Sequence, residues 1–173
     1  WTEHRLTLLT NKREEHIHSN TGRLLRLMLE NNSLIYLGEQ GWEDKIEEEI
    51  ARSEYTPVIF FPVTPFSDGQ EIVEEKGKPL NIIVLDTNWS SARRWLYKLG
   101  SMEIKKIGLR TVPPSKYYLR KQPKKENLCT FQAVTSLLDE LGTENSGPAT
   151  SHMNEMFALW VKSMAKERGL TFP

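Results

Sequence analysis

Apolar residues fall into five short runs that predict strands, and segments with helical spacing lie between them. The strand-like runs cover residues 6–10, 34–37, 58–61, 82–85 and 106–109. The helix-like runs cover residues 21–31, 43–53, 90–99 and 130–141, and an amphipathic terminal helix contains residues 156–164. Because strands alternate with helices and several strands are wholly apolar, we predict an α/β fold: a mainly parallel sheet with helices on both faces.

Two polar segments interrupt this alternation. Residues 65–79 are polar and charged and include Gly69 and Gly77, which indicates a long excursion or a mobile loop. Residues 142–150 form a second break before the terminal helix. The 173 residues show no internal repeat, so we expect a single domain over residues 1–173.

The composition is that of a globular protein, with 38% hydrophobic and 27% charged residues. No apolar run approaches the roughly eighteen residues that a membrane helix needs. The single cysteine excludes an internal disulfide framework and a cysteine-based zinc site, and the four histidines are scattered, so we predict no metal site. We expect a reducing compartment, which is the cytoplasm or, in a eukaryote, also the nucleus.

The net charge is zero, but the charges are unevenly distributed along the chain. Residues 86–130 contain eleven Lys/Arg and three Asp/Glu, and the remainder contains twelve and twenty, so the balances are +8 and −8. This asymmetry predicts a basic face that binds a polyanion. The alternative is a solvated surface with its tyrosines packed inward. The predicted RNA-binding residues are Arg110, Lys116, Tyr117, Arg120, Lys121, Lys124 and Lys125.

The segment NIIVLDTNWSSARRW, residues 81–95, carries the clearest candidate chemistry. A buried strand runs directly into Asp86, Trp89 follows in the same turn, and Arg93 and Arg94 come one helical turn later. The carboxyl end of a parallel strand is where open α/β sheets bind their ligands. The alternative is that Asp86, Thr87, Asn88 or Ser90 is only a helix cap, Trp89 belongs to the core and the arginines are solvated.

A second segment, SKYYLRKQPKKENLCTFQA at residues 115–133, adds further motifs. Together the two segments resemble the DTW-domain family, whose pattern is Asp-x-Thr-Trp, Ser-x-x-Arg, Tyr-x-Leu-Arg-x-x-Pro and Ser-Thr-x-Glu-Ala. The corresponding residues here are 86–89, 90–93, 117–123 and 129–133, and residues 13–14 and 20–23 also resemble the family. Asn88, Cys129 and Gln132 stand where the family has Thr, Ser and Glu, and the family's N-terminal cysteine cluster is absent.

The resemblance implies a fold similar to the knotted SPOUT RNA-modifying enzymes, with a C-terminal trefoil knot. It implies transfer of the 3-amino-3-carboxypropyl group from S-adenosylmethionine to N3 of a uridine in tRNA, with release of 5′-methylthioadenosine. Asp86 would remove the N3 proton. The alternatives are a non-catalytic RNA-binding relative or a methyltransferase, and the sequence leaves the oligomeric state open. The predicted cofactor-binding residues are Trp89, Ser90, Arg93, Leu128, Cys129, Thr130 and Gln132.

Overall fold

A computed structural model describes residues 2–62, 67–120, 127–142 and 146–170. Within these residues, five parallel strands form one sheet in the order β2-β1-β4-β3-β5. The strands are β1 (Arg5–Thr10), β2 (Asn32–Tyr36), β3 (Thr56–Phe60), β4 (Leu80–Asp86) and β5 (Lys105–Ile107). The sequence prediction of five strands in a parallel sheet is confirmed.

Seven helices connect or flank these strands in the described part of the chain. They are α1 (Lys12–Glu15), α2 (Thr21–Met28), α3 (Trp42–Ile50), α4 (Gly69–Lys76), α5 (Trp89–Leu99), α6 (Thr130–Leu141) and α7 (Ser146–Glu167), and a 3₁₀ turn, η1 (Gly100–Met102), follows α5. Four of the predicted helices are therefore confirmed within a few residues. The terminal helix begins earlier than expected, because α7 already starts within the predicted break of residues 142–150.

The expectation of a long loop over residues 65–79 is wrong, because α4 lies within it. Asp68 caps this helix by accepting the N–H of Gln70 at 2.8 Å, and Gly77 ends it in the left-handed region at φ 60°. Ile72 is 2% exposed and anchors the helix in the core. A short helix that buries so few apolar side chains has too weak a periodicity to be detected in the sequence.

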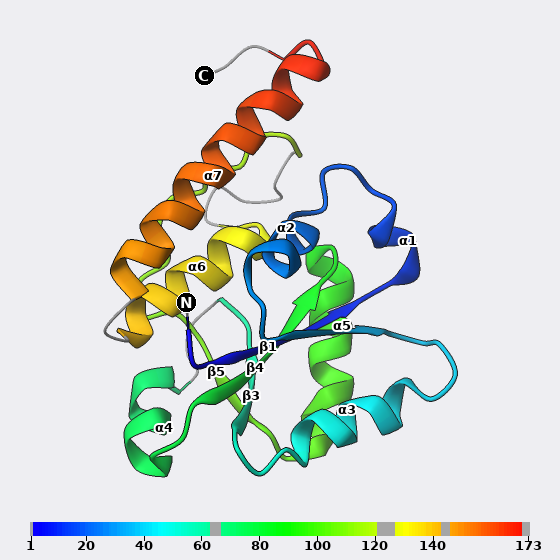
Figure 1. The fold of residues 1–173 in the computed structure, drawn as a ribbon. Helices are drawn as coiled ribbons and strands as arrows, with labels where there is room; N and C mark the ends of the chain where they lie inside the picture. The colour runs from blue at the N-terminus through cyan, green and yellow to red at the C-terminus, as the bar shows by residue number, and fades with distance from the viewer. Residues whose placement is uncertain (1, 63–66, 121–126, 143–145, 171–173) are drawn as a thin grey trace.

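Alternate residues of the central strands face two separate hydrophobic clusters. Ile82 and Val84 of β4 pack in one cluster with residues of α2, α4, α6 and α7, whereas Ile83 and Leu85 pack in the other with residues of α3 and α5. Figure 1 shows α4, α6 and α7 on one side of the sheet and α3 and α5 on the other. Helices on both faces are therefore confirmed.

The carboxyl ends of the two central strands carry the candidate site. Thr10 ends β1 and lies in register with Asp86, which ends β4. The helices α2 and α6 both begin next to this edge, since Phe131 N–H donates to Thr21 Oγ1 at 3.3 Å. Among the described helices, none is long and apolar enough to cross a membrane.

Candidate functional site

Asp86 occupies the point where strand β4 ends and two helices begin. Its side chain is buried, and residue Asp86 is 7% exposed. The hydroxyl of Thr130, the first residue of α6, donates to Asp86 Oδ1 at 2.7 Å. On the other strand, Thr10 Oγ1 donates to the backbone carbonyl of Asp86 at 2.8 Å. The carboxylate is therefore fixed by the tertiary packing of segments that are far apart in the sequence.

Burial raises the pKa of the Asp86 carboxyl above its ordinary value. Hydrogen bonds from Thr130 and Asn20 oppose this shift, the charge of Glu14 adds to it, and the charge of Arg120 opposes it. Because these favourable contacts do not offset the loss of water, the pKa stays raised. A raised pKa makes the ionised carboxylate a stronger base, which is a frequent property of catalytic acids and bases.

Gly22 allows helix α2 to approach this carboxylate. A Cβ at Gly22 would lie 2.2 Å from Asp86 Oδ2, closer than any carbon and oxygen can pack. Asn20 caps the same helix, because its Oδ1 accepts the N–H groups of Gly22 at 2.8 Å and Arg23 at 3.2 Å. The requirement for glycine here is close approach to Asp86. Residues 20–23, Asn-Thr-Gly-Arg, were noted in the sequence for their resemblance to the family, but the contact of Gly22 with Asp86 was not predicted.

A cavity of about 200 Å³, here called the α6-side cavity, opens on one side of Asp86. It is lined by Glu14, Ser19, Asn20, Thr21, Asp86, Thr87, Asn88, Trp89, Tyr117, Arg120, Leu128, Cys129 and Thr130. A smaller apolar slot of about 40 Å³ shares Trp89, Leu128 and Thr130 with it and extends between Phe60, Phe61, Val84 and Ala133. The structure thus brings together four of the seven predicted cofactor-binding residues.

Arg120 brings a positive charge into the α6-side cavity. Its Nε donates to Ser19 Oγ at 2.8 Å, and its Nη1 lies 3.5 Å from Glu14 Oε2. Its Nη2 is buried and has no hydrogen-bond partner among the described residues. A buried N–H group without a partner is costly, so this guanidinium is prepared to bind an anionic oxygen in the cavity.

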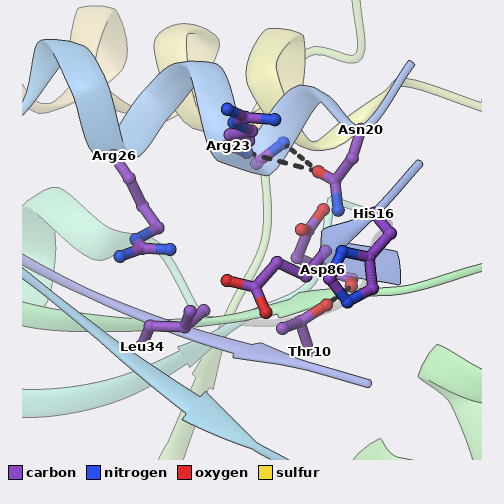
Figure 2. A pocket seen from close by; sticks show the side chains of 9 residues that line it. Thr10, His16, Asn20, Arg23, Arg26, Leu34 and Asp86 are labelled. Carbon is purple, nitrogen blue, oxygen red and sulfur yellow. Dashed lines mark hydrogen bonds between the residues drawn. The ribbon is translucent and has the colours of Figure 1, made fainter. Parts of the chain in front are cut away.

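A second cavity, of about 320 Å³ and here called the α2-side cavity, lies on the other side of Asp86. Its lining residues are Thr10, Glu15, His16, Asn20, Gly22, Arg23, Arg26, Leu34 and Asp86. Figure 2 shows Arg26, His16 and Asp86 around one hollow, with Asn20 bonded to the start of α2. The sequence analysis did not include Arg23, Arg26 or His16 among its site residues.

Three predicted cofactor residues do not line the α6-side cavity. Ser90 and Arg93 are exposed on α5, and Arg93 lines a separate open groove with Tyr97 and Lys98. Gln132 is buried, and its Oε1 accepts from Ser115 Oγ at 3.3 Å and from Lys116 N–H at 3.2 Å. Gln132 therefore positions the loop before Tyr117. A glutamate carboxylate could accept the same two bonds. Gln132 can therefore replace the glutamate of the family pattern given in the sequence analysis.

The predicted RNA-binding residues separate into different environments. Tyr117 is 4% exposed, its hydroxyl donates to the Ser19 carbonyl at 2.7 Å, and its ring packs near Phe157. The prediction that Tyr117 binds RNA is therefore replaced by its alternative, in which the tyrosine packs inward. Arg110 is exposed and paired with Asp68, and Lys116 is exposed. Lys121, Lys124 and Lys125 lie outside the described residues.

The simpler interpretation of Asp86 as a helix cap is also decided by the structure. The cap of α5 is Asn88, whose Oδ1 accepts the Ser91 N–H at 3.0 Å, so capping does not explain Asp86. Burial raises the pKa of the Cys129 thiol to about 11, which leaves it protonated and unsuited to act as a nucleophile. Among the described residues, no group of three His, Cys, Asp or Glu side chains could hold a metal ion.

Comparison with known proteins agrees with this arrangement of motifs. No solved structure matches the chain. The family model described as DTW domain matches residues 2–165, nearly the whole length, and includes every residue of both cavities. The chain therefore belongs to the DTW domain family.

Proposed function

We propose that this protein transfers the 3-amino-3-carboxypropyl group of S-adenosylmethionine to N3 of a uridine in tRNA. Membership of the DTW family implies a role in tRNA modification. The observation that carries the finer proposal is Asp86, a buried carboxylate with a raised pKa that lines two cavities at once. A reaction between two substrates needs a base at the point where their binding sites meet.

The α6-side cavity has the chemistry that S-adenosylmethionine requires. Trp89 and the apolar slot beside it offer a flat, dry surface for the adenine ring. The unpartnered Nη2 of Arg120 can bind the carboxylate of the methionine moiety. Leu128 and Cys129 supply apolar contacts between these two ends. The side chains present in the cavity therefore fit this cofactor.

The residues around Asp86 would act on the nucleophile. Uridine N3 carries a proton and becomes a good nucleophile only when that proton leaves, and the Asp86 carboxylate would accept it. Thr130 holds Oδ1, and the start of α2 closes over the carboxylate, so the base is oriented before the substrates arrive. The cofactor supplies a methylene beside a sulfonium: the N3–carbon bond forms while the carbon–sulfur bond breaks, leaving its electron pair on sulfur.

The same family resemblance predicts a SPOUT-like fold with a C-terminal trefoil knot. The all-parallel sheet is compatible with that prediction, and α6 begins at the carboxyl end of β4, where Thr130 bonds Asp86. An experimental structure that traces the whole chain tests the knot.

Mass analysis of tRNA nucleosides tests the proposed reaction. The protein is incubated with S-adenosylmethionine and tRNA, and the tRNA is then digested to nucleosides. We expect a uridine that carries the mass of the aminocarboxypropyl chain, together with 5′-methylthioadenosine. A methyl group in its place would show a methyltransferase, and unmodified tRNA would leave only RNA binding, so either result would reject the proposal.

Binding of the cofactor is tested separately. Ligands that bind only the folded protein raise its melting temperature by mass action. We expect 5′-methylthioadenosine and S-adenosylmethionine to raise the melting temperature, and the shift to be lost in Trp89→Ala. If neither ligand in large excess shifts the wild-type transition, the assignment of the α6-side cavity is wrong.

A further inference from the structure

The α2-side cavity has a different chemistry from the cavity across Asp86. Arg23 and Arg26 lie three residues apart on α2, and both side chains are exposed. Within the described part of the chain, neither guanidinium forms a salt bridge with a carboxylate. His16 lies at the same cavity. Two guanidinium groups without a carboxylate partner, beside one cavity, can bind an anion. Phosphate suits them, because a planar guanidinium group can donate two parallel hydrogen bonds to its oxygens.

The acidic groups of the same cavity lie on other elements than the two arginines, since Glu15 ends α1 and Asp86 ends β4. The hydroxyl of Tyr36 donates a hydrogen bond to the Glu15 carboxylate. Burial together with this bond raises the pKa of Tyr36 to about 12. Asp86 lies buried at the inner end, where its carboxylate is bonded to Thr130. The two guanidinium groups of the cavity thus lie along α2, apart from the buried carboxylate of Asp86.

The two cavities lie over different strands of the sheet, so each could bind a different ligand. Leu34 of β2 and Thr10 of β1 line the α2-side cavity, whereas the apolar slot of the α6-side cavity lies over Phe60 of β3 and Val84 of β4. In the strand order β2-β1-β4-β3, Leu34 and Thr10 lie on one side of β4, which ends at Asp86, and Phe60 lies on the other side. A displacement reaction needs the nucleophile to approach away from the leaving group, and two cavities across one base meet that requirement.

We propose that the α2-side cavity binds the target nucleotide of the RNA, with Arg23 and Arg26 on the phosphates that flank it. The edge of the uracil base reaches Asp86, and Leu34 contacts the ring. The assignment rests on the proposed function for the identity of the base, but the anion site stands on its own geometry. Its volume of about 320 Å³ is near the lower end of small-molecule sites and suits one nucleotide rather than a longer segment.

A binding experiment with a matched control tests this site. The probe is a fluorescein-labelled oligouridylate, measured by anisotropy over a range of salt concentrations. The test variant is Arg23→Gln with Arg26→Gln, and the control is Lys162→Gln with Lys166→Gln, which removes the same two charges from α7. We expect the test variant to weaken binding about tenfold and to lower the salt slope by about 1.4, because each contact with a single strand contributes about 0.7, with less than half that effect in the control.

Equal weakening in the two variants, an unchanged affinity in the test variant, or no binding of the probe to the wild type would overturn the proposal. Urea unfolding of both variants accompanies the titration, because Arg23 and Arg26 are exposed and the fold should be retained. A third, conservative variant, Arg23→Lys with Arg26→Lys, keeps the charges. It should recover most of the salt slope.

A measurement of 5′-methylthioadenosine binding distinguishes a failure of this proposal from a failure of the proposed function. Affinity for 5′-methylthioadenosine should be unchanged in Arg23→Gln with Arg26→Gln, and reduced about tenfold or more in Trp89→Ala. Loss of 5′-methylthioadenosine binding in the arginine variant, with oligouridylate binding intact, would assign the cavity to the cofactor and overturn the proposal. If the arginines bind oligouridylate but tRNA gains no aminocarboxypropyl group, the nucleotide site stands and the proposed transfer fails.

Discussion

Asp86 and Glu49 are two carboxylates with the same small exposed fraction at opposite ends of the same sheet, and the shifts of their pKa values are opposite. Each is 7% exposed. Glu49 of α3 lies at the end where β1 and β4 begin, and it accepts bonds from Arg5 at 2.7 and 2.9 Å and from Arg52 at 2.9 Å. Asp86, where β1 and β4 end, accepts the 2.7 Å bond of the neutral Thr130 hydroxyl.

The pKa values reflect both the depth at which each carboxyl is enclosed and the charge of its partners. Desolvation is the largest single effect on Glu49 and raises its pKa, but the bonds and charges of Arg5 and Arg52 together outweigh it and lower the pKa to about 2. Desolvation also raises the pKa of Asp86, and neutral donors leave it raised. A buried carboxylate bonded directly to guanidinium groups holds the fold together, whereas one bonded only to neutral donors keeps the basicity that a reaction can use.

Replacing Asp86 by Asn should give the largest effect. The amide keeps the shape but cannot accept the N3 proton, so we expect the single-turnover transfer rate to fall about 10³-fold, or ~4 kcal/mol in the barrier. The free energy of unfolding should not decrease, because a buried carboxylate with a raised pKa costs stability when it ionises. Transfer at the wild-type rate with both substrates bound would refute the role of Asp86 as the base.

Replacing Glu49 by Gln should produce the converse result. The change leaves the partly buried Arg5 guanidinium without its carboxylate, so we expect the free energy of unfolding to fall by about 3 kcal/mol. The transfer rate per folded molecule should be unchanged, because Glu49 lies at the other end of the strands. Urea unfolding and single-turnover kinetics below the unfolding transition measure the two quantities. A loss of rate without a loss of stability would contradict the comparison.

Adding a methyl group at Gly22 should couple stability to the site. A Cβ there would collide with the Asp86 carboxylate, so Gly22→Ala should cost about 1–2 kcal/mol of unfolding free energy and also lower the transfer rate. Gly147 is the matched control, since it is also helical and its Cβ would meet nothing within 4 Å among the described residues. Gly147→Ala should be neutral or stabilising by a few tenths of a kcal/mol. Equal results for the two variants would show that α2 can shift away from Asp86 at little cost, and would contradict this prediction.

Acid should act on the two carboxylates with opposite sign, and this is the smallest expected effect. Because the Glu49 pKa is lowered, its stabilisation is present above its unfolded pKa and is lost as the pH falls toward about 2. The stability difference between wild type and Glu49→Gln should therefore shrink by about 1 kcal/mol between pH 7 and pH 3.5.

Asp86, with its raised pKa, contributes stability at low pH that is lost as the pH rises through the folded pKa. Any advantage of Asp86→Asn should therefore also shrink on acidification, while the wild-type carboxyl becomes protonated. Urea titrations of the three proteins at several pH values measure both trends. An advantage of Asp86→Asn that grows in acid would contradict the raised pKa.

Much of the fold could be predicted from the sequence, because burial in a parallel sheet leaves a local pattern. Residues 82–85 are apolar on both faces, as a central strand must be, and Asp86 directly after them predicts a ligand site at the strand end. The spacing of residues 86–89 and 117–133 also gave the family that the match over residues 2–165 confirms. These features depend on neighbouring residues alone, so one chain is enough to read them.

The partners of each buried group were decided only by the tertiary structure. Thr130 is 44 residues from Asp86 and Arg5 is 44 residues from Glu49, so no local pattern distinguishes the two carboxylates. The same reason explains why Tyr117 was predicted at the surface and Arg23 and Arg26 were missed. A sequence shows which side chains are charged or apolar, but packing determines which of them meet, which lose water, and therefore which pKa values rise or fall.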